Sequence, residues 1–190
     1  MKIGYEGSRF EEAINRVKEF VYFLSLIPFK ILRIRFLNRK EVGAWKRYAE
    51  QGKRASPERF KQHVNKWLDW QLAEKPAGLT PVSKKLSGVI HNQKYKTKAI
   101  YFLGDGVPND GEIEQIEVLF LNRPNPENSP TAFWSCTNED DLVEWMKDLE
   151  ERAPYCSELD DYNDEIREVR KDQGTYLPYN YGTHLVGMRS

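Results

Sequence analysis

The stretch Lys98-Ala-Ile-Tyr-Phe-Leu-Gly-Asp105-Gly-Val-Pro-Asn-Asp110 decides the fold that the sequence predicts. A continuous run of apolar and β-favouring residues stops at Asp105, which Gly and Pro follow. Such a run, bounded by turn residues, predicts a strand that is buried on both faces. Because open α/β sheets bind their ligands at the carboxyl ends of the strands, Asp105 is a candidate binding residue.

A second stretch, Gly78-Leu-Thr80-Pro81, lies just before this strand and opens a helical pattern. Thr followed by Pro is typical of a helix N-cap and first turn. Val82, Leu86 and Val89 then follow at helical spacing, so the sequence predicts a helix that leads into the buried strand.

The chain on either side of these stretches alternates between helical and strand patterns. On the amino-terminal side we expect a helix over 8–27 that begins with a Ser8–Glu11 capping box, a strand over 30–37 and a mostly helical section over 41–77. On the carboxyl-terminal side we expect a helix from Asp110, a strand over 131–136, a helix from Thr137, a short strand ending at Leu159 and a last helix stopped by Gly174. This alternation is typical of a mostly parallel α/β sheet with helices on both faces and right-handed crossovers.

Composition narrows the class of protein. The length of 190 residues fits one domain, and 29 Lys and Arg balance 29 Asp and Glu. A net charge of zero argues against a strongly basic nucleic-acid binder, so we expect no nucleic acid as partner. Two Cys are too few for a disulfide scaffold, which favours reduced thiols in a cytoplasmic setting. Pro28 and several cations interrupt the apolar stretch 21–36, so we expect no membrane span there.

The order of these motifs resembles a von Willebrand factor type A domain. The resemblance rests on a capped helix with Glu12-Ala13, a strand ending Phe36-Leu37-Asn38, the Gly-x-Thr-Pro turn at 78–81 and the strand that ends in Asp-Gly-x-Pro-Asn-Asp. Ser135 to Asp141 and Leu159 to Asp161 also fall where this family has its last strands and loops. The resemblance covers nearly the whole chain. It implies a three-layer Rossmann-like domain over 1–190, with 41–77 as a helical insertion or elaboration.

The resemblance also implies a site for a divalent metal. Domains of this family hold the metal with oxygen ligands from three loops at the top edge of the sheet. By this resemblance Thr80 and Asp105 match the threonine and aspartate loops. Mg²⁺ or Mn²⁺ bound there would suit hard oxygen ligands and could take the acidic side chain of a protein partner.

One motif of the family is missing from the chain. The first metal-binding loop, Asp-x-Ser-x-Ser, lies at the end of the central strand, and this sequence contains no such motif. We therefore expect the central first strand and loop to lie upstream of Met1, and we expect this chain alone to bind metal weakly or not at all. An in-frame stop codon directly before Met1 would contradict this hypothesis.

Structural readings compete with the metal site. Thr80 with Pro81 is also an ordinary helix start, and Asp105 with Gly106 is also an ordinary turn. Either motif alone favours the structural reading, whereas the two together, in this order, favour a metal-site role. The chain's three His residues have no metal-ligand spacing and receive no role. Trp45, Trp67 and Trp70 could form a base-stacking surface, but without excess positive charge we expect them in the core or in helix packing.

The leading functional hypothesis is a protein-binding module rather than an enzyme. An alternative is a Mg²⁺-dependent phosphatase similar to the haloacid dehalogenases, because Gly104-Asp-Gly-Val-Pro-Asn-Asp110 is similar to their Gly-Asp-Gly-x-Asn-Asp motif. Against it, the sequence has one extra residue in that motif and no Asp-x-Asp for the nucleophile. A degenerate interaction domain without metal is the third possibility.

Overall fold

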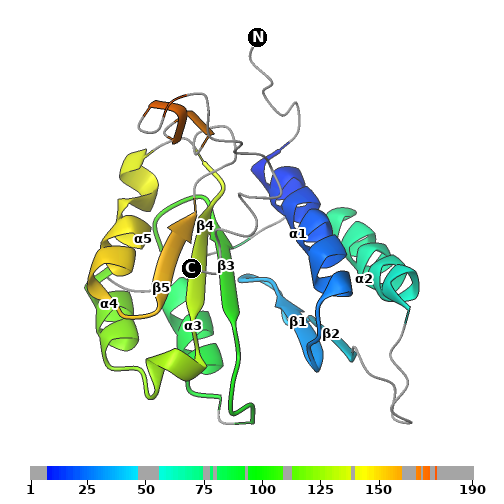
Figure 1. Cartoon of the computed structure of the whole chain (residues 1–190), viewed down its shortest axis with the longest axis horizontal. Coiled ribbons are helices and arrows are strands. Elements are labelled where there is room, and N and C mark those ends of the chain that lie inside the picture. The colour runs from blue at the N-terminus through cyan, green and yellow to red at the C-terminus, as the bar shows by residue number, and fades with distance from the viewer. Residues whose placement is uncertain are drawn as a thin grey trace. The chain divides into compact units, whose positions relative to one another are not determined.

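The computed structural model describes residues 8–46, 56–74, 78, 81–92, 94–108, 113–137, 140–159, 166–167, 169–171 and 174. It is a mixed α/β structure that contains a three-stranded parallel sheet and a separate two-stranded hairpin (Figure 1). The chain divides into two compact units, Met1–Thr80 and Pro81–Ser190. We call them unit 1 and unit 2 and describe each by itself.

Unit 1 consists of two helices and a hairpin. Its elements are α1 (Arg9–Leu26), β1 (Ile31–Arg35), β2 (Val42–Lys46) and α2 (Pro57–Leu72). The expected capping box at Ser8 and Glu11 is present, with both reciprocal hydrogen bonds formed, and Ser56 caps α2 in front of Pro57. These local signals explain why both helices begin where they do.

The section 41–77 was expected to be mostly helical, but its first part forms the strand β2. Val42–Lys46 pairs antiparallel with β1, so that Arg35 lies opposite Val42 and Leu32 lies opposite Trp45. The inward positions of β2 are Gly43 and Trp45, and a glycine at an inward position weakens the alternating apolar pattern that marks a strand. The backbone pairing with β1 therefore defines β2, whereas the sequence pattern of β2 only weakly indicates a strand.

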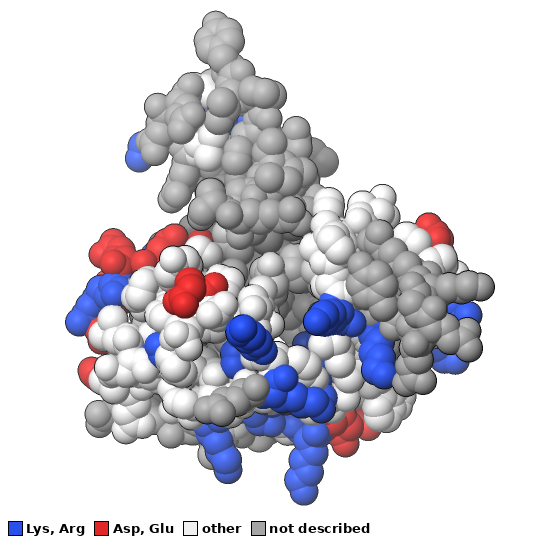
Figure 2. Space-filling model, turned by 60° about the horizontal axis from the view of Figure 1, so that its bottom comes forward, with Lys and Arg blue, Asp and Glu red and all other residues white. Residues whose placement is uncertain are grey.

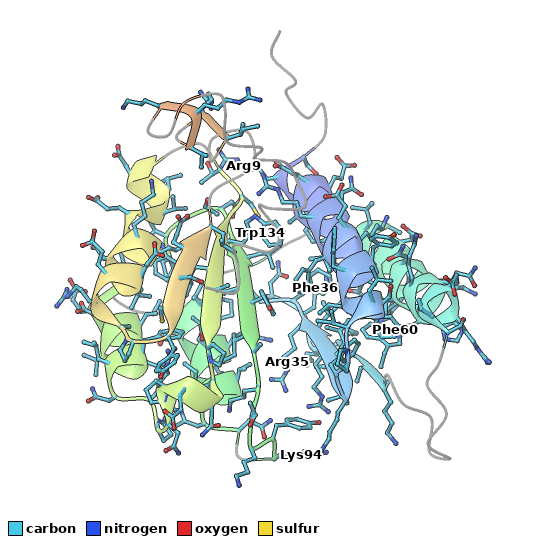
Figure 3. The ribbon with its side chains drawn as sticks, in the orientation of Figure 1. Arg9, Arg35, Phe36, Phe60, Lys94 and Trp134 are labelled. Atoms are coloured by element: carbon cyan, nitrogen blue, oxygen red, sulfur yellow. The ribbon has the colours of Figure 1, made fainter. Side chains whose placement is uncertain are left out.

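The core of unit 1 lies where the helices meet the inner face of the hairpin. Ile14 and Val21 of α1 are buried with Phe60, Val64 and Leu68 of α2. Partly buried residues of the hairpin region and helices cover this cluster: Phe10, Val17, Phe29, Leu32, Ile34, Phe36, Trp45, Trp67 and Leu72. Figure 3 shows Phe36 and Phe60 among these side chains. The expected alternation of β1 is confirmed, because Arg33 and Arg35 are exposed while Leu32 and Ile34 are half-buried.

Unit 2 contains the parallel sheet. Its elements are α3 (Val82–Ile90), β3 (Ile100–Gly104), α4 (Ile113–Leu121), a 3-10 helix η1 (Pro126–Asn128), β4 (Thr131–Ser135), α5 (Asp140–Arg152) and β5 (Cys156–Leu159). The strand order is β3-β4-β5, and both pairs are parallel. The expected strands near 98–104 and 131–136 and the short strand ending at Leu159 are confirmed, but the expectation that the first of them is buried on both faces is wrong, because Tyr101 of β3 is exposed.

The middle strand β4 is the centre of unit 2. All five of its residues are buried, and β3 and β5 pair with it on either side. The Phe133 ring packs at 5.1 Å from Phe120 of α4 and at 5.7 Å from Trp145 of α5. Phe102 of β3 joins the same cluster at 6.0 Å from Phe133, so helices and sheet share one aromatic core.

Other expectations in unit 2 are met only in part. Helix α3 begins at Val82 after Pro81, and no side chain caps it. Thr80, the expected cap, lies outside the described residues. Of the expected last helix, residues 166–167 and 169–171 are helical, and Gly174 has a φ of 78°. Within the described residues, no helix combines the length and the apolar character needed to cross a lipid bilayer.

A first prediction concerns the two glycines that flank Asp105. A Cβ at Gly104 would lie 2.7 Å from a ring carbon of Phe102, whereas a Cβ at Gly106 would meet no atom within 4 Å. We expect Gly104→Ala to lower the free energy of unfolding by about 1–3 kcal/mol through overpacking. The matched variant Gly106→Ala should change it by less than about 0.5 kcal/mol. Urea unfolding checks both, and equal effects of the two variants would contradict the close packing at Gly104.

Candidate functional site

The carboxyl edge of the unit 2 sheet carries the candidate site. Asp105 follows directly after β3 and is exposed. The backbone N–H of Cys136 donates to the Gly104 carbonyl at 2.8 Å, so the pairing of β3 with β4 continues to the last residue of β3. The parallel register therefore holds the Asp105 backbone beside the segment that leaves β4, at the edge where α/β sheets bind ligands.

The polar side chains at this edge differ in what they can offer a ligand. Ser135 is buried, and its hydroxyl donates to the Leu159 carbonyl at 3.4 Å, so it serves the link between β4 and β5. Thr137 is half-buried and Asp105 is exposed. A carboxylate and a hydroxyl are the hard oxygen donors that Mg²⁺ prefers. Among the described residues at this edge, Asp105 presents an exposed carboxylate directly after the end of a strand.

Of the two predicted metal ligands, the structure describes Asp105 but not Thr80. Thr80, Asp110, Asp160 and Asp161 all lie outside the described residues. In the described part of the chain, no three His, Cys, Asp or Glu side chains gather closely enough to hold a metal ion. The metal site therefore stays a prediction.

A second polar cluster lies at the amino edge of the same sheet. The Arg123 side chain is 3% exposed and donates to the Pro154 carbonyl, to Thr131 Oγ1 at 3.2 Å and to Cys156 Sγ at 3.4 Å. Its guanidinium also lies 5.1 Å from the centre of the Phe120 ring. Because Thr131 and Cys156 are the first residues of β4 and β5, Arg123 joins the end of α4 to the start of both strands. The sequence patterns gave no sign of this cluster.

The thiol of Cys156 is held protonated in this cluster. Burial raises the pKa of Cys156 above its ordinary value, and the negative charge of Glu150 raises the pKa further. The charge of Arg123 and its hydrogen bond to the sulfur act in the opposite direction but do not outweigh burial. A thiol with a raised pKa is a poor nucleophile near neutral pH, and the hydrogen bond from Arg123 ties the Cys156 side chain to the end of α4.

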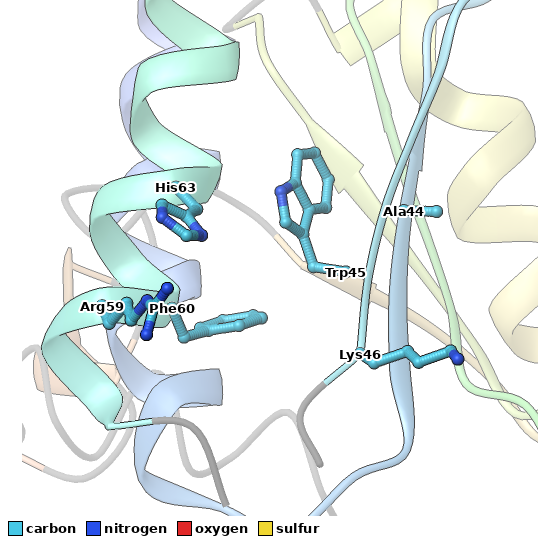
Figure 4. A pocket seen from close by; sticks show the side chains of 6 residues that line it. All are labelled: Ala44, Trp45, Lys46, Arg59, Phe60 and His63. Atoms are coloured by element: carbon cyan, nitrogen blue, oxygen red, sulfur yellow. The ribbon is translucent and has the colours of Figure 1, made fainter. Parts of the chain in front are cut away.

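Unit 1 contains a recess that sequence reasoning did not identify. It has a volume of about 420 Å³ and is lined by Ala44, Trp45 and Lys46 of β2 and by Arg59, Phe60 and His63 of α2. Figure 4 shows the rings of Phe60 and His63 on the side of α2 that faces Trp45. The volume lies within the range of about 300–1,000 Å³ that is usual for ligand sites. The sequence alone gives His63 no role, and it favours core or helix packing for Trp45 because the chain as a whole has no excess positive charge.

A second prediction separates the charges that act on Cys156. Replacing Glu150 by Gln removes a negative charge that raises the thiol pKa, so iodoacetamide should alkylate Cys156 faster near neutral pH. Glu151→Gln is the matched control on the same helix and should leave the rate unchanged, because Glu151 is not among the groups that shift this pKa. Peptide mass spectrometry distinguishes Cys156 from Cys136. A slower reaction in Glu150→Gln would contradict the stated cause.

Comparisons with known proteins found no relative of this chain. No family model matches the chain, and neither the curated proteins nor the solved structures contain a match.

Proposed function

We propose that the chain is a protein-binding module of the von Willebrand factor A type, which engages a partner at the carboxyl edge of its parallel sheet. The observation that carries the proposal is Asp105, an exposed carboxylate directly after a strand of a parallel sheet. The order of motifs in the sequence supports the same assignment, from the capped α1 through the Gly-x-Thr-Pro turn to Asp105.

A three-layer Rossmann-like sheet is part of this proposal. Among the described residues, β3 pairs with β4 on one side and with no strand on the other. A sheet edge of this kind presents unpaired N–H and C=O groups that can accept a further strand. An additional strand at this edge would place β3 inside the sheet and Asp105 nearer its middle.

The proposed chemistry is shared coordination of a divalent cation. In a site that is incomplete in this chain, because the first metal-binding loop of the family is missing, Asp105 and Thr80 would supply a carboxylate and a hydroxyl to weakly held Mg²⁺ or Mn²⁺, and water would fill other positions. An acidic side chain of the partner would take one of these positions, which makes binding dependent on metal. Both cysteines are free thiols, in keeping with the cytoplasmic setting that we propose for the module.

A third prediction tests the metal site. Mg²⁺ or Mn²⁺ at about one hundred times its dissociation constant should stabilise the folded chain by about 2.7 kcal/mol. For a domain of this size we expect the melting temperature to rise by several degrees. Asp105→Ala and Thr80→Ala should each abolish the rise. Asp148→Ala is the control, because Asp148 is an exposed acid in the second half of α5.

The same experiment can contradict the proposal. An equal shift in wild type, Asp105→Ala and Asp148→Ala would mean that metal binds elsewhere. No shift in any of the four proteins would favour a degenerate interaction domain that uses no metal. Hydrolysis of p-nitrophenyl phosphate that depends on Mg²⁺ and on Asp105 would instead favour the phosphatase alternative.

A further inference from the structure

The parallel sheet of unit 2 has two faces, and helices α4 and α5 cover one of them. Successive residues of a strand point to opposite faces, and the register aligns Phe102 of β3 with Phe133 of β4. Phe133 packs against Phe120 of α4 and Trp145 of α5, so both helices lie on this side of the sheet. Helix α3 packs beside α4. We call this side the helix face and the opposite side the second face.

The second face is apolar, and most of it is buried as well. Its residues are Tyr101 and Leu103 of β3, Ala132 and Trp134 of β4, and Cys136, whose backbone N–H continues the pairing of β4 with β3. Ala132, Trp134 and Cys136 are only 3–6% exposed, although α4 and α5 lie on the helix face. The cover of the second face therefore comes from another part of the chain.

The distribution of charge along the chain points to one segment as this cover. Unit 1 contains 17 Lys and Arg residues against 9 Asp and Glu residues, a formal net charge of +8, and unit 2 contains 12 against 20, a formal net charge of −8. Figure 2 shows charged side chains of both signs over the described surface. Yet the sequence from Gly174 to Met188 contains no Lys, Arg, Asp or Glu at all. An uncharged stretch of this length in so charged a chain suits burial better than exposure to water.

The same segment has the side chains that a contact with an apolar sheet needs. Its large apolar residues are Tyr176, Leu177, Tyr179, Tyr181, Leu185, Val186 and Met188. Tyrosine joins an apolar ring to a hydroxyl that can stay in water at the rim of a contact, and aromatic rings pack well against an indole such as that of Trp134.

The segment is also long enough to reach across the sheet. The Gly174 N–H donates to the Arg170 carbonyl at 3.1 Å, and the φ of 78° at Gly174 is typical of a residue that ends a helix. The residues after Gly174 are therefore free to leave the helical path. Twelve extended residues span about 40 Å, whereas neighbouring strands lie only about 4.8 Å apart.

We propose that the segment 175–188 folds back onto the second face of the parallel sheet and covers Trp134 and Cys136. The occupant of this apolar face is thus a part of the same unit of the same chain. The contact uses neither metal nor Asp105, so the inference stands independently of the function proposed for the carboxyl edge.

The first experiment measures alkylation of Cys136 by iodoacetamide in the full chain and in the double variant Leu185→Asp with Val186→Asp. Because neighbouring residues of an extended segment point to opposite sides, one of the two carboxylates would enter the contact and detach the segment. Cys136 should then react about ten-fold faster. Cys156 is the internal control, because it begins β5 at the opposite edge of the sheet, and its rate should stay within about two-fold of wild type. Peptide mass spectrometry separates the two cysteines.

The matched control places the same two charges on the exposed side of α4, Val118→Asp with Leu121→Asp. Val118 is 56% exposed and Leu121 is 42% exposed, so carboxylates there stay in water. The alkylation rate of Cys136 should remain within about two-fold of wild type. Equal acceleration in the two double variants, or no acceleration in either, would overturn the proposal.

The second experiment tests the contact itself and inserts no charge. Tyr176→Cys, Tyr179→Cys, Tyr181→Cys and Leu185→Cys are made one at a time in the full chain and are oxidised mildly with copper phenanthroline. A disulfide forms only where two Cα atoms come within about 4.4–6.8 Å of each other. We expect an intramolecular disulfide with Cys136 from at least one of these positions and none from the control Val118→Cys. Failure of all four positions to reach Cys136 would overturn the proposal, and a disulfide that joins two chains at Cys136 would identify a second copy as the cover in place of this segment.

Discussion

Burial of β4 is the constraint on which the parallel sheet depends. A strand whose five residues are all buried can satisfy its backbone hydrogen bonds only through the strands on either side. Its partners β3 and β5 must therefore run beside it in register, and their carboxyl ends must meet at one edge. The exposed Asp105 owes its position to this arrangement, because the strand that carries it cannot shift without exposing the centre of the sheet.

Local signals in the sequence were sufficient for several elements. The capping box predicted the start of α1, the alternation of Arg33 and Arg35 with Leu32 and Ile34 predicted β1, and the uninterrupted apolar run predicted β3. Each signal depends on residues close together in the chain. The order of these elements was enough for a mixed α/β fold with a parallel sheet.

Features that depend on pairing between distant segments were not predicted. The strand β2 exists because it pairs with β1, and Gly43 removes the apolar residue that would have marked its inner face. The recess needs β2 and α2 together, and the Arg123 cluster needs α4, β4 and β5 together. Of the two predicted metal ligands, Asp105 lies at the carboxyl edge of the parallel sheet and Thr80 lies outside the described residues, so the metal site stays a prediction. The division of charge, by contrast, can be read in the sequence once the boundary between the units is known.

The two units differ in the sign of the charge that they attract. An acidic unit concentrates divalent cations around itself and repels a partner's carboxylate, so a bound metal would have to offset the charge of unit 2 before an acidic partner could dock. Unit 1 needs no such intermediary for an anionic ligand. Each half of the chain thus carries a formal net charge of a different sign, +8 for Met1–Thr80 (17 basic and 9 acidic residues) and −8 for Pro81–Ser190 (12 basic and 20 acidic residues), although the protein as a whole is neutral.

The Trp45 ring fills the space that a side chain at Gly43 would occupy, and this contact also restricts how the hairpin can form. A shift of one residue between the strands would exchange the inner and outer faces of β2, placing Trp45 in water and Lys46 in the core. Two-stranded hairpins are prone to such slippage, because few hydrogen bonds oppose it. The ring that fills the place of a missing side chain gives the native alignment a contact that the shifted alignment lacks. The glycine that concealed the strand from pattern analysis is thus one of the residues that keeps it in register.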